Sequence, residues 1–120
     1  MKIEITLDCS DPERLAEFWA SALGYRRIFA HDPYVGLDPA DGNGPRLLLQ
    51  RVPEPKTVKN RMHIDIRRAD FEQEADRLVA LGARRLTPGV FTEPGTDSHW
   101  IVMADPEGNE FCLVSDRPAQ

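Results

Sequence analysis

His63 and Asp65 are the residues whose types and spacing suggest chemistry most directly. They stand two positions apart in RMHIDI (residues 61–66), where polar and apolar residues alternate. Such alternation predicts a half-buried strand that carries both side chains on one face. Histidine changes charge near neutral pH, and a neighbouring carboxylate can orient its ring, so the pair is a candidate general acid or base. A structural histidine in a polar patch is the alternative interpretation of the same pattern.

Two cysteines and two tryptophans are the other candidates. Cys9 and Cys112 each lie in an apolar run, where a reduced cysteine is usually a small core side chain, and two thiols do not make a disulfide framework. Cys112 would need a positive neighbour to become a nucleophile, and the sequence shows none, so a packed thiol is favoured. Trp19 is predicted to lie in the core. Trp100 is left open between pocket wall and core.

The composition limits the class of protein and its partners. A chain of 120 residues with 15 Lys and Arg against 20 Asp and Glu has a net charge of −5, and no basic run exceeds two residues. These values fit one globular domain and exclude the basic surface of a nucleic-acid-binding protein. No stretch reaches the ~18 apolar residues of a membrane span, and no signal peptide is evident, so we expect a cytoplasmic protein without membrane contact. Dinucleotide-binding, P-loop, HExxH, CxxC and GxSxG motifs are absent.

The chain repeats itself once. LGYRRI (residues 23–28) matches LGARRL (residues 81–86) at four of six positions. Around each copy the residue pattern predicts a strand, a helix and then three strands. We therefore expect a single α+β domain, 1–120, made of two modules at about 1–53 and about 60–116. The proline-punctuated segment 54–59 is the predicted linker.

Both predicted helices carry start and stop signals. Asp11, followed by proline, predicts the start of the first helix, and Asp70 with Gln73 predicts a capping box at the start of the second. Gly24 and Gly82 stand where a left-handed residue would end each helix. Helical spacing predicts a buried apolar stripe of Leu15, Phe18, Trp19 and Ala22 on the first helix, and of Phe71, Ala75, Leu78 and Val79 on the second.

Runs of alternating or continuous apolar residues predict the strands. Besides the strands that follow the helices, they are 3–9, 34–37, 47–52, 62–66, 100–103 and 111–114. DPADGNGP (residues 38–45) and DPEGN (residues 105–109) are turn signals. The segment 88–98 is predicted to be irregular, either a plain surface loop or a lid over a pocket.

One face of each module's first strand is polar. The polar residues are Glu4, Thr6 and Asp8 in the first module and His63, Asp65 and Arg67 in the second. The closing strands, 47–52 and 111–114, are apolar on both faces, which implies that the face opposite each helix is covered too. We therefore expect the two sheets to enclose a concavity of mixed lining, which is how small-molecule sites are usually built.

Three segments carry a family resemblance. DPERLAEFWASALGY, RMHIDI and the closing VMADPEGNEFCLV resemble the vicinal oxygen chelate superfamily, and are most similar to its glyoxalase-like branch, found beside bleomycin-resistance proteins and extradiol dioxygenases. The resemblance spans essentially the whole chain. It implies two βαβββ modules that form a cupped, incompletely closed mixed-sheet barrel with the helices outside, commonly as a homodimer.

The resemblance also implies four metal-ligand positions, which fall on Glu4, Gln50, His63 and Cys112. Glu4 and His63 are expected to be equivalent in the repeat, as are Gln50 and Cys112 in the closing strands. Only Glu4 and His63 are ordinary ligands for a divalent cation, because Gln50 is a weak donor and Cys112 would have to lose its proton. No cofactor is therefore predicted, and a divalent metal held by Glu4 and His63, with Gln50 or Cys112, is the alternative.

Three hypotheses for function follow. The first is a metal-independent lyase or isomerase in which His63, oriented by Asp65, is the general acid or base. The second is a protein that sequesters a drug or metabolite without chemistry, similar to bleomycin-resistance proteins. The third is a divalent-metal glyoxalase or dioxygenase. In each, a small molecule is the partner, and the predicted binding residues are Glu4, Thr6, Gln50, His63, Asp65, Trp100 and Cys112.

Overall fold

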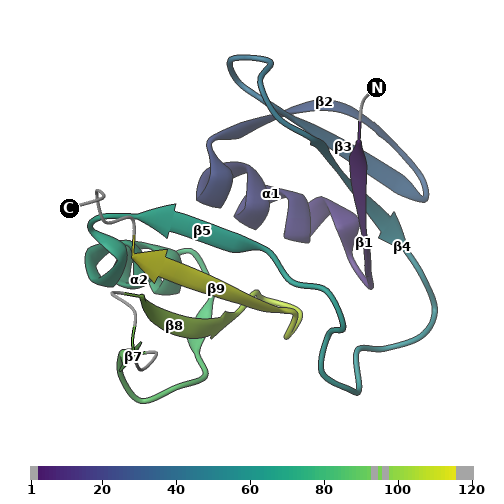
Figure 1. Cartoon of the computed structure of the whole chain (residues 1–120). Coiled ribbons are helices and arrows are strands. Elements are labelled where there is room, and N and C mark those ends of the chain that lie inside the picture. Colours follow the sequence, from purple (N-terminus) through teal and green to yellow (C-terminus); the bar gives the residue numbers. More distant parts are fainter. Residues whose placement is uncertain (1–2, 93–94, 96–97, 116–120) are drawn as a thin grey trace. The chain divides into compact units, whose positions relative to one another are not determined.

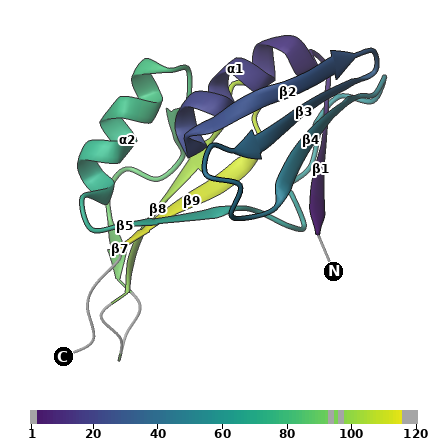
Figure 2. The ribbon, with the colours of Figure 1, turned by 90° about the horizontal axis from the view of Figure 1, so that it is seen from above.

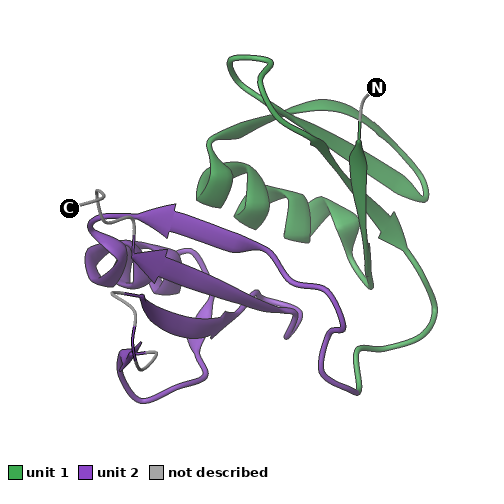
Figure 3. Cartoon of the chain, in the orientation of Figure 1, with its two compact units in different colours: residues 1–57 green, residues 58–120 purple. Residues whose placement is uncertain are grey.

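The computed structural model describes residues 3–92, 95 and 98–115. The chain divides into two compact units, Met1–Thr57 and Val58–Gln120 (Figure 3). Unit 1 contains β1 (Glu4–Cys9), α1 (Pro12–Leu23), β2 (Tyr25–His31), β3 (Tyr34–Pro39) and β4 (Arg46–Arg51) (Figure 1). Its sheet has the order β1-β4-β3-β2, with β1 parallel to β4 and the other pairs antiparallel. The predicted βαβββ order is confirmed for this module.

Helix α1 begins and ends where the sequence predicts. The Asp11 carboxylate accepts a hydrogen bond of 3.2 Å from the backbone N–H of Arg14, and Gly24 ends the helix with a φ of 68°. This left-handed conformation costs glycine little because it has no Cβ atom. The whole predicted stripe, Trp19 included, is buried. Apolar side chains of β3 and β4 complete the core: Val35, Leu37, Leu47 and Leu49.

Unit 2 repeats this order with one additional short strand. Its elements are β5 (Asp65–Arg68), α2 (Phe71–Ala80), β6 (Arg84–Arg85), β7 (Phe91–Thr92), β8 (His99–Ala104) and β9 (Glu110–Ser115). The sheet order is β5-β9-β8-β6, β5 is parallel to β9, and β7 pairs with β8 (Figure 2). The α+β class with two mixed sheets is confirmed. Neither described helix is long and apolar enough to cross a membrane.

Three details of unit 2 differ from the prediction. The first strand starts at Asp65 rather than at Met62, which is 80% exposed, because β9 offers backbone partners only from Ile64 onward. Strand β7 lies inside the segment predicted to be irregular, where two residues pair with β8. Val79 is 44% exposed instead of buried.

The predicted capping box at Asp70 is also wrong. The Asp70 carboxylate makes no capping hydrogen bond to the helix and accepts instead from Arg68 Nε and Nη2, at 2.8 and 3.2 Å. Two charge-assisted hydrogen bonds from a guanidinium are stronger than one hydrogen bond from a backbone N–H. The Asp70 carboxylate therefore binds Arg68 instead of capping the helix. Helix α2 ends at Ala80 with Leu81 as its C-cap residue, and the next residue, Gly82, has a φ of 118°.

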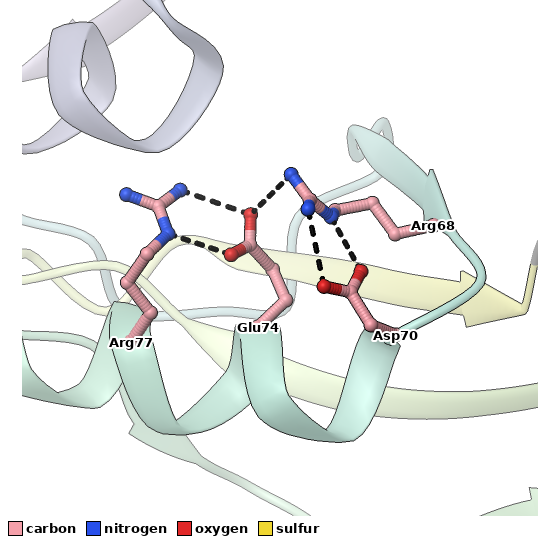
Figure 4. A network of polar contacts seen from close by, with 4 residues as sticks. All are labelled: Arg68, Asp70, Glu74 and Arg77. Carbon is pink, nitrogen blue, oxygen red and sulfur yellow. Dashed lines mark hydrogen bonds and ion pairs between the residues drawn. The ribbon is translucent and has the colours of Figure 1, made fainter.

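A buried carboxylate lies between two arginines on α2 (Figure 4). Glu74, whose side chain is 3% exposed, accepts from Arg77 Nε at 2.6 Å and Nη2 at 2.9 Å, and Arg68 Nη1 lies 3.5 Å from it. The hydrogen bonds from Arg77 lower the pKa of Glu74 although burial opposes this change. The network joins the end of β5 to the first turns of α2.

The two faces of the unit 2 sheet follow from strand register. Phe111, Leu113, Ile101 and Met103 are buried on the side of α2. Arg68 and Arg85 reach residues of α2, which assigns their positions to the same side. Because side chains alternate along a strand, Asp65, Arg67, Cys112, Val114, Trp100 and Val102 lie on the opposite side. We call this opposite side the helix-free face of unit 2.

The DPEGN segment is a turn built on a buried carboxylate. Asp105 is 1% exposed and accepts from the backbone N–H groups of Glu107 and Asn109, both at 2.9 Å, and from the Asn109 side-chain amide. Buried carboxylates need such partners because desolvation is costly. These hydrogen bonds hold the turn between β8 and β9, so Asp105 and Asn109 have a structural role.

Candidate functional site

His63 and Asp65 meet at the start of β5. His63 Nε2 lies 3.1 Å from Asp65 Oδ1, and both side chains are about half exposed. A carboxylate only accepts hydrogen bonds, so a neutral imidazole that donates to Asp65 would carry its proton on Nε2 and keep its lone pair on Nδ1. In that tautomer the ring offers one basic nitrogen to a bound molecule.

Cys112 is the third member of this cluster. It lies directly opposite Asp65 in the β5–β9 pair, and its backbone N–H donates to the Ile64 carbonyl at 2.9 Å. The ligand atoms of His63, Asp65 and Cys112 all lie within 4.8 Å of one another. The pairing of β5 with β9 thus brings Cys112 to the His63–Asp65 pair, from which it is far apart in the sequence.

The Cys112 thiol is held in its neutral form. Burial is the main cause that raises its pKa, and the charge of Asp65 raises it further. Lys59 acts in the opposite direction with a smaller effect. Lys59 is the positive neighbour that the sequence did not reveal, but it does not reverse the shift. Cys112 therefore suits a hydrogen-bond donor or site wall better than a nucleophile.

Trp100 shares the helix-free face with the cluster. It lies on β8 opposite Val114, two residues from the position opposite Cys112, and is partly exposed. Its ring stacks on Phe91 with centroids 6.2 Å apart and an interplanar angle of 26°. Phe91 was not predicted as a site residue because it lies in the segment expected to be irregular. Only the pairing of β7 with β8 brings it to Trp100.

Glu4, Thr6 and Gln50 belong to unit 1, on the side of its sheet opposite α1. Glu4 Oε1 lies 3.9 Å from Arg46 Nη1, while the Arg46 guanidinium donates to Asp38 at 2.9 and 3.3 Å. Three of the seven predicted binding residues thus belong to unit 1, and the other four, His63, Asp65, Trp100 and Cys112, belong to unit 2.

Strand register corrects one predicted equivalence. Thr6 and Asp65 each lie five residues before the aspartate that begins the helix, so they correspond. Leu48 lies opposite Thr6, whereas Cys112 lies opposite Asp65. The equivalent of Cys112 is therefore Leu48, and Gln50 lies two residues further along β4. The apolar closing strands did not reveal this offset because register depends on backbone pairing as well as on pattern.

The donor set restricts which metal could bind at the cluster. An imidazole, a carboxylate and a thiol would suit a borderline ion such as Zn²⁺ rather than a hard ion such as Mn²⁺. The raised pKa of Cys112 opposes thiolate ligation, so a bound cation would have to displace the thiol proton. The number and spacing of the three residues fit a zinc-like ion. The protonated thiol of Cys112 fits such an ion less well, because zinc binds the thiolate.

Comparisons with known proteins place this arrangement in a family. The model of the glyoxalase-like domain matches residues 4–114. A glyoxalase-related enzyme from Fulvimarina pelagi is similar in structure at 23% identity, with a TM-score of 0.73 over 97% of this chain and 88% of that chain. A glyoxalase/bleomycin resistance protein/dioxygenase family enzyme from Burkholderia phytofirmans PsJN has 18% identity and a TM-score of 0.70, over 93% and 95% of the chains.

A third similar structure contains ligands. It is a mutant of the fosfomycin resistance protein FosX from Listeria monocytogenes, complexed with Mn(II) and 1S,2S-dihydroxypropylphosphonic acid. The identity is 16% and the TM-score 0.74, over 92% of this chain and 85% of that chain. A search of curated protein sequences gives no match. The family model covers nearly the whole chain and the solved structures share its fold, so the chain belongs to the glyoxalase-like domain family of the vicinal oxygen chelate superfamily.

Proposed function

We propose that this protein is a metal-independent enzyme that binds a small molecule on the helix-free face of unit 2 and moves a proton on it. His63 is the general acid or base, and Asp65 is the residue that positions it. The observation that carries the proposal is the 3.1 Å contact between His63 Nε2 and Asp65 Oδ1, which leaves Nδ1 available. A positioned histidine typically contributes about 10²–10⁴-fold to a proton-transfer rate.

The surroundings of the pair support proton transfer over covalent catalysis. The one thiol in the cluster, Cys112, has a raised pKa and stays protonated near neutral pH. A neutral thiol can donate a hydrogen bond to a substrate oxygen, but it is a poor nucleophile. Both members of the His63–Asp65 pair are partly exposed, so protons can exchange with solvent between turnovers.

Exchange of solvent deuterium into weakly acidic C–H groups tests the proposal without a known product. Small ketones and carbon acids are incubated with the protein in D₂O that contains a chelator, and loss of the C–H signal is followed by NMR. We expect His63→Gln to slow the catalysed exchange by about 10²-fold or more, and Asp65→Asn to slow it less, because Asp65 acts through the ring.

His31→Gln is the matched control, since His31 lies on β2 in unit 1 and its ring meets Phe29 edge to face. Equal exchange rates for wild type and His63→Gln would contradict the assignment of His63. Stoichiometric ligand binding without any exchange would instead favour the sequestering hypothesis.

A divalent-metal enzyme is the second candidate, because the ligand atoms of His63, Asp65 and Cys112 lie within 4.8 Å of one another. The Mn(II) complex of FosX also favours it, through a protein of the same fold. A bound cation would supply Lewis-acid polarisation of a substrate oxygen. Metal analysis after incubation with Zn²⁺ or Mn²⁺ distinguishes the candidates. A stoichiometric metal that is lost in both His63→Ala and Cys112→Ser would replace the metal-independent proposal.

A further inference from the structure

His63 lies on a segment that is not itself a strand. Strand β5 begins at Asp65, and residues 60–64, which we call the His63 segment, are neither helix nor strand. Met62, next to His63, is 80% exposed, and the His63 side chain is 40% exposed. Segments with few buried contacts and no strand pairing open easily. The contact between His63 and Asp65 therefore depends on other bonds that hold the backbone of the segment.

Strand β9 supplies such a bond at each end of the His63 segment. At one end, the backbone N–H of Cys112 donates to the Ile64 carbonyl at 2.9 Å. At the other end, the backbone N–H of Asn60 donates to Glu110 Oε1, also at 2.9 Å. The second bond joins residues that are 50 positions apart in the sequence. His63 thus lies between two anchors on the same strand.

The Glu110 carboxylate acts where the backbone ladder has ended. Asp65 lies opposite Cys112, so the same register continued by two residues places His63 opposite Glu110. No backbone pairing forms there, and the side chain of Glu110 reaches Asn60 instead.

The first module solves the same problem differently. Glu4 occupies the position that corresponds to His63, and it lies inside β1, opposite Arg46 of β4. The ladder itself holds that residue. In unit 2 a carboxylate on β9 replaces the missing part of the ladder, which makes Glu110 specific to the module that carries the acid–base pair.

The bond to Glu110 is strong enough to matter for geometry. A hydrogen bond from a backbone N–H to a carboxylate is charge-assisted, and both Asn60 and Glu110 are partly buried, which limits competition from water. Without this bond the His63 segment is held only at Ile64, next to His63. A catalytic group displaced by about 1 Å can lose about 10²-fold in rate.

We propose that Glu110 is a positioning residue for His63. Its carboxylate holds the backbone at Asn60 and thereby keeps the imidazole in contact with Asp65. Glu110 acts through the backbone and does not have to touch a substrate. The inference rests on the proposed function only where it concerns proton transfer, because the position of the ring can be measured without a reaction.

Variants of Glu110 in the full chain test this role by NMR and by deuterium exchange into carbon acids. We expect Glu110→Ala to speed hydrogen exchange of the Asn60 amide about tenfold or more. The same variant should mix the two His63 tautomers and lower kcat of the catalysed exchange about fivefold or more, with KM little changed. Glu110→Gln keeps an acceptor oxygen and should restore most of each property.

Two further variants complete the test. Asn60→Pro removes the N–H donor and keeps the carboxylate, so it should reproduce the effects on His63 and serves if Glu110→Ala does not fold. Glu72→Ala is the matched control, since Glu72 is an exposed carboxylate on α2 in the same unit and should behave as wild type. Unchanged amide exchange at Ile101 and Leu113, which are buried in β8 and β9, confirms that each variant is folded.

The outcomes separate this inference from the proposed function. Asn60 exchange or His63 tautomers that are equal in wild type and Glu110→Ala would overturn the positioning role, and so would a loss that Glu110→Gln does not restore. Catalysis that needs His63 but is unchanged in Glu110→Ala would overturn it as well and leave the proposed function intact. If wild type catalyses no exchange, the proposed function fails, and a His63 ring disturbed in Glu110→Ala and restored in Glu110→Gln still confirms the positioning.

Discussion

Cys112 tests the electrostatics of the site at the scale of one residue. Burial and the charge of Asp65 raise its pKa, so we expect iodoacetamide to alkylate Cys112 slowly near neutral pH. The alkylation rate should rise only at pH values above those at which an ordinary thiol loses its proton. Asp65→Asn removes one cause of the shift and should speed alkylation, whereas Lys59→Gln should slow it. Rates are measured against pH in a Cys9→Ser background with chelator present.

A Cys112 that reacts as fast as free cysteine at pH 7 would contradict this assignment. It would also reopen a nucleophilic role for the thiol. Cys9 is 4% exposed, so wild type and the Cys9→Ser background should react alike under native conditions.

The tautomer of His63 is a second prediction at this scale. Because Asp65 Oδ1 lies 3.1 Å from Nε2 and can only accept, the neutral ring should carry its proton on Nε2 and present a bare Nδ1. Long-range nitrogen–proton NMR distinguishes the two tautomers. Asp65→Asn should mix them, since an amide can donate as well as accept. A ring protonated on Nδ1 in the wild-type protein would be incompatible with the proposed base.

The sequence predicted that His63 and Asp65 lie together but not which residues surround them. His63 and Asp65 could be found because a period of two places them together without knowledge of the partner strand. Lys59 and Phe91 could not be predicted as neighbours of the pair and of Trp100, since each depends on which segments lie side by side in the fold. Alternation in the sequence indicates which residues of one strand share a face, but it does not indicate how two strands pair in register.

Glu74 makes the contribution of helix α2 to the stability of the fold depend on pH. The hydrogen bonds from Arg77 lower the pKa of Glu74 in the folded state. The ionised carboxylate therefore stabilises the fold fully at pH values above the pKa of Glu74 in the unfolded chain, and this stabilisation is lost as the pH falls through the pKa in the folded state. We expect Glu74→Gln to lower the free energy of unfolding by about 2 kcal/mol at pH 7. This difference should shrink below about pH 4.

Urea unfolding of both proteins between pH 3 and pH 7 measures this difference. Glu72→Gln is the control, since Glu72 lies exposed on the same helix and should change stability little. A Glu74→Gln deficit that stays constant or grows toward pH 3 would contradict the account of the network.

The DPEGN turn makes the next prediction at the scale of an element. Asp105→Ala removes the acceptor for three donors, two backbone N–H groups and the Asn109 amide, and should cost about 3 kcal/mol. Asp41→Ala is the comparison, because Asp41 is exposed and, among the residues that the structure describes, accepts one hydrogen bond, from the Asn43 N–H. Thermal unfolding that ranks the two variants equally would show that the buried carboxylate does not hold the turn.

Helices were predicted more accurately than short strands. Helix α1 carries its stripe, its cap and its glycine in one continuous segment, so local rules suffice. Strand β7 has two residues and exists only because β8 lies beside it. The capping box failed because Arg68, two residues before Asp70, competes for the same carboxylate. Local rules fail where a side chain has a second partner.

At the scale of the whole molecule, the modules share an architecture and differ in their chemistry. Both have a helix on one side of a mixed sheet, and the family model spans 4–114. Where the second module has His63, Asp65 and Cys112, the corresponding positions of the first have Glu4, Thr6 and Leu48. The acid–base cluster is thus a feature of one module.

The homodimer implied by the family resemblance stays a prediction. Light scattering after size-exclusion chromatography should give a mass of twice the 13.6 kDa of one chain. A single-chain mass at all concentrations would exclude the dimer and leave the site within unit 2 unaffected.

Deuterium exchange catalysed by the whole protein tests the central claim most directly. The rate is measured for wild type, His63→Gln and His31→Gln, each with and without chelator. We predict that wild type and His31→Gln catalyse exchange equally in both conditions and that His63→Gln loses about 10²-fold or more. Exchange that disappears with chelator, or that survives the loss of His63, would contradict a metal-independent acid–base role for the His63–Asp65 pair.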